Sequence, residues 1–175
     1  MQKLFKCIFS AALLLAITAC STHKVYQSDA ITASSRWVLL PISNLTQAPL
    51  AGERTEAILA SHLRATGIGQ LTEYPRPTEQ NRFGLNNDQI QLQQAKAWAK
   101  TQPAQYWVTG TVDEWQYKAG LDGEPAIGIS LKIIDANTEQ VIWSASGART
   151  GWGREGVAVA MHQLIEELLA ELNLD

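Results

Sequence analysis

Cysteine is almost absent from this chain, which has only Cys7 and Cys20 among its 175 residues. Both lie within the first twenty residues, so the remainder of the chain carries no thiol. We therefore expect a folded domain without disulfides, catalytic thiolates or zinc–sulfur sites.

The chain also lacks a long hydrophobic run. The apolar run at residues 8–17 has ten residues, about half of the roughly 20 that a membrane-spanning helix needs. Lys3 and Lys6 precede this run, as in a secretory signal. Ile17-Thr18-Ala19-Cys20 ends it and is typical of a bacterial lipobox, in which small residues precede the cysteine that takes up lipid. We predict that residues 1–19 are a lipoprotein signal peptide and that Cys20 carries diacylglycerol and palmitate.

The residue after the lipobox indicates where the protein resides. Ser21 stands where lipoproteins retained on the inner membrane usually have an acidic residue. We therefore predict a lipid-anchored protein on the periplasmic side of the outer membrane. The alternative is an ordinary secretory signal with a chance cysteine at its cleavage site.

Positive charge is scarce in the mature chain. Loss of Lys3 and Lys6 with the signal peptide leaves 12 basic residues against 17 acidic ones, a formal net charge of −5. This balance argues against a nucleic-acid partner and favours a cationic one. From residue 155 onwards the chain has five acids and no Lys or Arg: Glu155, Glu166, Glu167, Glu171 and Asp175. Acids near a helix carboxyl end oppose its dipole, so these residues form either a functional acidic face or a tolerated surface cost.

Motifs for catalysis are missing as well. His23, His62 and His162 are interpreted as three solvent-facing side chains, and no metal-binding His pair, serine elbow or phosphate-binding glycine loop occurs. Asp122 and Glu124 could be read as a glycosidase pair, but their spacing suits a turn better. We predict that the protein is not an enzyme and uses no cofactor or metal.

The first half of the chain alternates short apolar strands with amphipathic helices. Trp37-Val38-Leu39-Leu40 predicts a buried strand ended by Pro41. The sequence then predicts a helix over about residues 53–65 that Gly67 ends. A strand at 70–74 and a helix from residue 87 or 88 to about 101 follow. Residues 20–35 are polar and without periodicity, which predicts a lipidated tether, and residues 75–87 are predicted to be a loop.

The second half is rich in strand-forming residues. Strands are predicted at 106–112, 126–134 and 141–145, with a turn at 135–139. The last helix has one apolar stripe: Val157, Met161, Leu164, Ile165, Leu168 and Leu172. The order β-α-β-α-β-β-β-α predicts a single α/β domain over residues 36–175 with a mixed sheet, parallel among the early strands and antiparallel among the later ones.

Trp152 lies in an unusual position. Glycines flank it in a predicted loop, and Arg149 and Arg154 bracket it. A tryptophan between two cations suits the headgroup region of a membrane. The alternative is that Trp152 packs onto the sheet or onto a neighbouring subunit.

Three stretches resemble a known family. Residues 39–59 (LLPISNLTQAPLAGERTEAIL), 114–135 (EWQYKAGLDGEPAIGISLKIID) and 141–155 (VIWSASGARTGWGRE) are similar to the PelC family, outer-membrane lipoproteins of bacterial Pel exopolysaccharide export. The resemblance covers most of residues 37–172. Its most specific parts are the GLDGEP block and the pattern Trp-Ser-Ala-Ser-Gly followed by Gly-Trp.

The resemblance implies both a fold and a role. It implies a fold similar to the amino-terminal domains of TolB and CsgG, and a non-enzymatic subunit of a twelve-membered ring at the outer membrane. An acidic surface of that ring is expected to guide a cationic, partly deacetylated amino-sugar polymer towards the barrel protein PelB. Trp152, with Arg149 and Arg154, is expected to seat the ring on the membrane. Four acids are expected to belong to the polymer-guiding surface: Asp113, Glu114, Asp122 and Glu124.

Two other functions remain open from the sequence. A lipoprotein activator of a peptidoglycan synthase, similar in fold to LpoB, would act as a monomer on a long tether. The tether predicted here has only about 15 residues, or roughly 20–25 Å as a flexible coil, which favours the export function. A small periplasmic hydrolase is disfavoured because no nucleophile is paired with a base.

Overall fold

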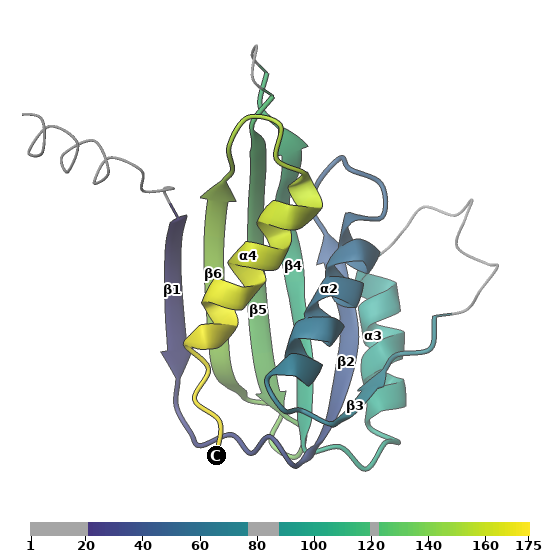
Figure 1. Ribbon diagram of the computed structural model, residues 1–175. Helices are drawn as coiled ribbons and strands as arrows, with labels where there is room; N and C mark the ends of the chain where they lie inside the picture. Colours follow the sequence, from purple (N-terminus) through teal and green to yellow (C-terminus); the bar gives the residue numbers. More distant parts are fainter. Residues whose placement is uncertain (1–20, 77–87, 120–122) are drawn as a thin grey trace, which may run out of the picture.

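The computed structural model describes residues 21–76, 88–119 and 123–175, and these form one six-stranded mixed sheet with three helices (Figure 1). The elements are β1 (Ser21–Gln27), β2 (Arg36–Asn44), α2 (Ala51–Ala65), β3 (Gln70–Glu73), α3 (Asp88–Ala99), β4 (Tyr106–Tyr117), β5 (Pro125–Asp135), β6 (Val141–Thr150) and α4 (Val157–Ala170). The strand order is β1-β6-β5-β4-β2-β3. β2 pairs in parallel with β3 and β4, whereas β4, β5, β6 and β1 pair antiparallel, which confirms the predicted α/β fold with a mixed sheet.

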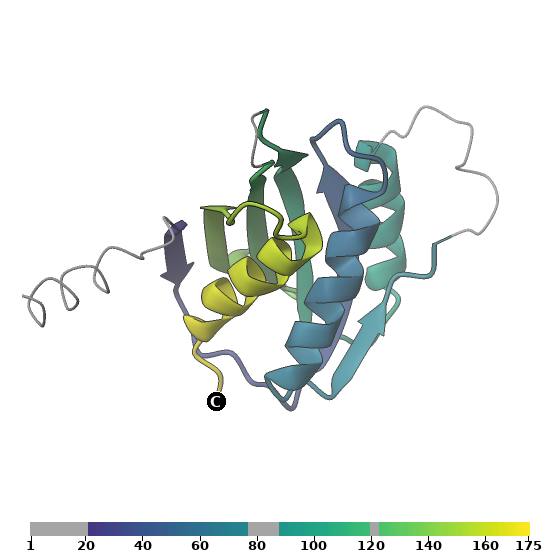
Figure 2. The same ribbon diagram turned by 45° about the horizontal axis from the view of Figure 1, so that its top comes forward.

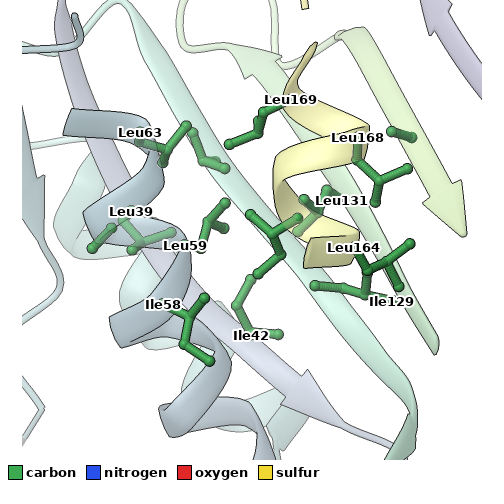
Figure 3. Close-up of a cluster of buried hydrophobic side chains, with 14 of the residues drawn as sticks. Leu39, Ile42, Ile58, Leu59, Leu63, Ile129, Leu131, Leu164, Leu168 and Leu169 are labelled. Atoms are coloured by element: carbon green, nitrogen blue, oxygen red, sulfur yellow. The ribbon is translucent and has the colours of Figure 1, made fainter. Parts of the chain in front are cut away.

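The main core lies between the sheet and the helices α2 and α4, which cover one face side by side (Figures 1 and 2). Figure 3 shows leucine and isoleucine side chains from both layers meeting there: Leu39, Ile42, Ile129 and Leu131 from the strands, and Leu59, Leu63, Leu164 and Leu168 from the helices. Truncation of such a leucine to alanine typically costs about 2–5 kcal/mol. A smaller cluster on the opposite face packs Trp107 and Leu40 beneath α3.

Helix α2 ends where the sequence predicts. Gly67 has a φ of 98°, a left-handed conformation that glycine adopts without steric cost. The N–H of Ile68 then donates to the Leu63 carbonyl oxygen at 3.2 Å, which closes the end of the helix. Ile58, Leu59 and Leu63 point into the core, as predicted.

The prediction that Pro41 ends the first strand is wrong. β2 continues through Pro41 to Asn44, and its pairing with β4 shifts register between Leu39 and Ile42. The Pro41 carbonyl oxygen accepts a hydrogen bond from Thr109 Oγ1 at 2.9 Å, and the N–H of Ile42 donates to Glu56 Oε1 at 2.7 Å. A proline is tolerated here because its missing N–H falls at the irregularity in the ladder.

The prediction that residues 20–35 are a tether without secondary structure is also wrong for the described residues 21–35. β1 pairs with β6 along its whole length, from Ser21 opposite Arg149 to Gln27 opposite Trp143. Ile31 is completely buried and forms a β-bridge with Leu174. This segment therefore belongs to the folded domain, and the sheet begins at the residue after Cys20.

The remaining predicted elements differ mainly in length. β4, β5 and β6 extend further than predicted, and α3 ends at Ala99. Most of the predicted loop at residues 75–87 lies outside the described residues. Within the described ranges, no helix is both long and apolar enough to cross a membrane.

Candidate functional site: the Trp152 loop and the uncovered sheet face

Trp152 lies in the connection between β6 and α4, and its side chain is 58% exposed. Trp37, Trp107 and Trp143, in contrast, are buried in the two core clusters. Most of the six tryptophans of the chain therefore belong to the core, and Trp152 is the one that is mostly exposed. The prediction that Trp152 occupies an exposed loop is confirmed for the isolated subunit.

Hydrogen bonds hold this loop in one conformation. The N–H of Gly151 donates to the Pro125 carbonyl oxygen at 2.9 Å, and the N–H of Trp152 donates to Glu155 Oε2 at 3.0 Å. A Cβ atom at Gly151 would clash with Glu155 Oε2 and lie 2.6 Å from Pro125 Cγ, so a larger residue would have to displace both side chains. Arg154 completes the turn with a φ of 69°. The indole is therefore presented to solvent by a fixed backbone.

The two arginines that bracket Trp152 lie in different environments. Arg154 is exposed beside Trp152, as a membrane-facing cation should be. Arg149 points under α4, where its side chain is only 11% exposed and its Nη1 donates to Glu167 Oε1 at 2.7 Å. The expectation that Arg149 flanks Trp152 as a free cation is therefore wrong, because β6 extends to Thr150 and turns Arg149 towards the helices.

Two of the predicted acids lie together on the sheet face opposite α2 and α4. The pairing of β4 with β5 shifts register between Val112 and Glu114, so Asp113 and Glu114 follow one another at an irregularity in the strand. Asp113 accepts hydrogen bonds from Thr111 Oγ1 at 2.7 Å and Ser130 Oγ at 2.8 Å. Glu114 Oε1 accepts one from Gln116 Nε2 at 2.8 Å.

These acids line a shallow, open groove of about 710 Å³ that crosses β1, β6, β5 and β4. Its floor is made of small residues, among them Gly128, Ser130, Ser146 and Ala148. Lys24 of β1 also lines the groove, so its charge is mixed rather than purely acidic.

The other two predicted acids belong to the connection between β4 and β5. Glu124 is partly exposed, and its carbonyl oxygen accepts the N–H of Lys118 at 2.8 Å. Asp122 lies outside the described residues. Glu114 lies three residues before Tyr117, the last residue of β4. Glu114 pairs with Gly128, and Tyr117 pairs with Pro125, the residue after Glu124. The structure thus places the described acids at two levels along the β4–β5 hairpin.

Two histidines meet in a contact that the sequence does not predict. His62 on α2 and His162 on α4 are each expected to face solvent, but His62 is only partly exposed, whereas His162 is exposed. Their rings meet between the two helices, with His62 Nε2 and His162 Nδ1 3.1 Å apart. Partial burial, and then the nearby charge of His162, lower the pKa of His62, whereas Glu166 acts in the opposite direction. Within the described ranges, no group of three or more His, Cys, Asp or Glu residues is arranged to hold a metal ion.

A second polar cluster, around Glu56, is structural. Glu56 on α2 accepts the N–H of Ile42 at the β2 irregularity and forms an ion pair with Arg76, which also hydrogen-bonds to Gln91 on α3. Burial raises the pKa of Glu56, and the Arg76 guanidinium partly offsets this rise. The cluster joins β2, α2, α3 and the segment after β3. It was not predicted because its members are far apart in the sequence.

Several solved structures are similar to this chain. The PelC dodecamer from Paraburkholderia phytofirmans superposes with a TM-score of 0.75 at 33% sequence identity, over 89% of this chain and 99% of that one. A leucine-to-methionine variant of that dodecamer gives a TM-score of 0.73, also at 33% identity, over 89% and 100% of the two chains. Lipoprotein GNA1162 from Neisseria meningitidis, at 14% identity and a TM-score of 0.53 over 79% and 97%, shares the fold.

No protein-family model matches the chain, and no curated protein sequence matches it. The likeness to the PelC subunit nevertheless extends over 89% of this chain and 99% of that subunit at one-third identity. The chain therefore belongs to the PelC family.

Proposed function

We propose that this chain is a lipid-anchored, non-enzymatic subunit of a Pel-type exopolysaccharide export system. Subunits assemble into a ring on the periplasmic side of the outer membrane, and the ring guides a cationic amino-sugar polymer towards a barrel partner of the PelB type. The observation that carries this proposal is the similarity to a PelC dodecamer over 99% of its subunit. The lipobox that ends at Cys20 supports the lipid anchor.

The start of the sheet supports a position close to the membrane. Ser21 is already paired with Arg149 in the sheet, so the residue that would carry the lipid directly precedes the folded domain. A monomeric activator that must reach across the periplasm needs a long flexible spacer instead. The short anchor therefore favours a ring that rests on the membrane over the LpoB-like alternative.

The acidic surface would act through many weak contacts. Each mature subunit has a formal charge of −5, and a closed ring repeats and concentrates that charge. Glu114 on the uncovered sheet face and Glu124 in the β4–β5 connection are the described candidates for contact with ammonium groups of the polymer. Asp113 is a weaker candidate because its carboxylate already accepts two hydroxyl hydrogen bonds. Weak contacts suit export, since the polymer must slide and leave.

A binding titration tests this role. The variant Glu114→Gln with Asp122→Asn and Glu124→Gln should bind a partly deacetylated amino-sugar polymer several-fold more weakly than the wild type. Salt that shortens the roughly 8–10 Å screening length should weaken binding to the wild type and have less effect on the variant. Asp29→Asn, which removes an exposed acid from the connection between β1 and β2, is the control and should bind like the wild type.

The same titration can refute the assignment. If binding is insensitive both to salt and to these carboxylates, the electrostatic guide is wrong as placed here. The exposed acids Glu166 on α4 and Glu171 directly after it would then be the next candidates.

A further inference from the structure

Exposed apolar side chains gather at one end of the sheet. Eight large hydrophobic side chains are exposed in the described part of the chain, and besides Ile90 at the start of α3, five of them lie at the end where β4 and β6 finish and α2 and α4 begin, the upper end in Figure 1. These five are Leu45, Leu50, Tyr117, Trp152 and Val159, each at least half exposed. We call this set the apolar end.

Topology brings the five together from separate parts of the chain. β2 and β4 are parallel, and β6 is parallel to β4 because each is antiparallel to β5. The loop after β2, the end of β4, the loop after β6 and the first turn of α4 therefore meet at the same edge. Clustering of this kind on a soluble surface marks an interaction site.

Leu50 is an unusual residue for its position. Its φ of 60° lies in the left-handed region, which favours glycine or asparagine, yet its side chain is an exposed leucine. The loop that carries it is held by Asn44, whose Nδ2 donates to the Ala48 carbonyl oxygen at 2.7 Å. Asn44 Oδ1 accepts the N–H of Thr46 at 2.9 Å. As at Trp152, a fixed backbone presents an apolar side chain to solvent.

The position of the first strand favours lipid as the partner of the apolar end. Ser21 lies opposite Arg149 near the end of β6, so the chain that precedes Ser21, beginning with Cys20, joins the sheet at the apolar end. Three exposed cations stand among the same loops, together with the partly exposed acids Glu53, Glu124 and Glu155: Arg54 in the first turn of α2, Lys118 after β4, and Arg154 beside Trp152. Apolar side chains mixed with Trp, Tyr and cations suit the boundary between headgroups and acyl chains.

We propose that the loop between β2 and α2, through Leu45 and Leu50, enters the lipid headgroup region together with Trp152, Tyr117 and Val159. The membrane-seating surface is thus two loops and a strand end rather than a single tryptophan. This inference rests on the proposed function, because it extends the membrane contact assigned there to the lipid-anchored ring.

Vesicle binding of the mature chain without its lipid tests the proposal. The background is residues 20–175 with Cys20→Ser, and the probe is vesicles of phosphatidylethanolamine and phosphatidylglycerol. Leu45→Ser with Leu50→Asn should weaken partitioning at least about ten-fold, because apolar surface is lost from every subunit that touches the vesicle. Asparagine suits the left-handed backbone at position 50. Val141→Ser removes an exposed apolar side chain at the start of β6, the other end of the sheet, and should not change partitioning.

A labelling experiment gives a second readout that does not depend on stability. The Cys20→Ser background has no thiol, so Leu45→Cys can be labelled with a polarity-sensitive fluorophore. Its emission should shift to shorter wavelength when vesicles are added, and emission from a label on Val141→Cys should not shift. The proposal is overturned if the label at position 45 stays in water while the protein binds vesicles.

The outcomes separate this proposal from the function on which it rests. If Trp152→Ala weakens vesicle binding and the leucine variant does not, the membrane contact stands and the leucine loop is not part of it. If the leucine variant dissociates the assembly and its separate subunits bind vesicles as wild-type subunits do, the loop contacts a second copy of the chain and the proposal is wrong. If the unlipidated wild type ignores vesicles at every concentration, the membrane contact itself fails while ring formation remains a separate question.

Discussion

Arg149 on β6 and Glu167 on α4 form an ion pair that joins the sheet to its covering helix. From the sequence alone, Arg149 is expected at the membrane and Glu167 in solvent. The strand predicted from the sequence ends at residue 145. If the alternation of side chains between the two faces is continued to residue 149, Arg149 falls on the same face as the buried Trp143 and Ala145. The period-two pattern that would have located Arg149 was therefore present but was not followed far enough.

Removal of the carboxylate should destabilise the domain. Glu167→Gln leaves the guanidinium of Arg149 largely buried without its counter-charge, and we expect a loss of about 1–3 kcal/mol in the free energy of unfolding. Urea denaturation measures this. Glu171→Gln, which neutralises an exposed acid one turn further along the chain, is the matched control and should change stability by less than about 0.5 kcal/mol. Equal effects of the two variants would show that the ion pair contributes nothing of its own.

Some residues were predictable because the local sequence decides their position. Glycines on both sides of Trp152 leave it no strand or helix in which to be buried, so its exposure followed from the sequence. The contact of His62 with His162 depends on how α2 packs against α4, and the sequence of either helix does not contain that information.

The helices and central strands were predictable because each has a strong periodic pattern. The apolar stripe of α4 and the β-branched residues of β5 decide their own structure. β1 was missed since most of its side chains are exposed at the edge of the sheet, so no alternation between apolar and polar residues marks it. Pro41 was misread because the irregularity that accommodates it exists only when β4 is paired alongside.

The packing of α2 against α4 predicts a dependence of stability on pH. The pKa of His62 is lower in the folded protein than its ordinary value near 6.5, so the unfolded chain takes up the proton first as the pH falls. The free energy of unfolding therefore carries no penalty from His62 above about pH 6.5, and it decreases as the pH falls below that value. The charged groups facing His62 across the helix contact are His162 and Glu166, and Glu166 partly opposes the effect.

Thermal denaturation between pH 7.5 and 5.5 measures this dependence. Wild type should lose more of its melting temperature over this range than His62→Gln, which cannot take up a proton at that position. His23→Gln, which replaces a histidine on β1, is the control and should retain the wild-type loss. An identical loss in wild type and His62→Gln would mean that the histidine contact does not couple protonation to folding.

At the scale of the whole molecule, the apolar end and the uncovered sheet face differ in character. The apolar end carries Trp152, the leucine loop and the chain connection to Cys20, whereas the uncovered sheet face is polar and lined by small residues. In a symmetric ring every subunit makes the same contacts. If the apolar end of each subunit rests on the membrane, the same surface of each subunit therefore faces the centre of the ring. The α/β fold and family membership were predicted from the sequence. Which faces form the subunit contacts was not predictable, because that depends on surfaces built from residues far apart in the chain.

The mass of the unlipidated mature chain in solution tests the central claim of a ring most directly. Residues 20–175 with Cys20→Ser should sediment as one closed species with a mass close to that of a dodecamer, the assembly of the similar PelC structures. That species should persist on dilution through the micromolar range, since each subunit in a closed ring is held by two neighbours. A monomer at every concentration would contradict the ring and would favour the monomeric activator instead.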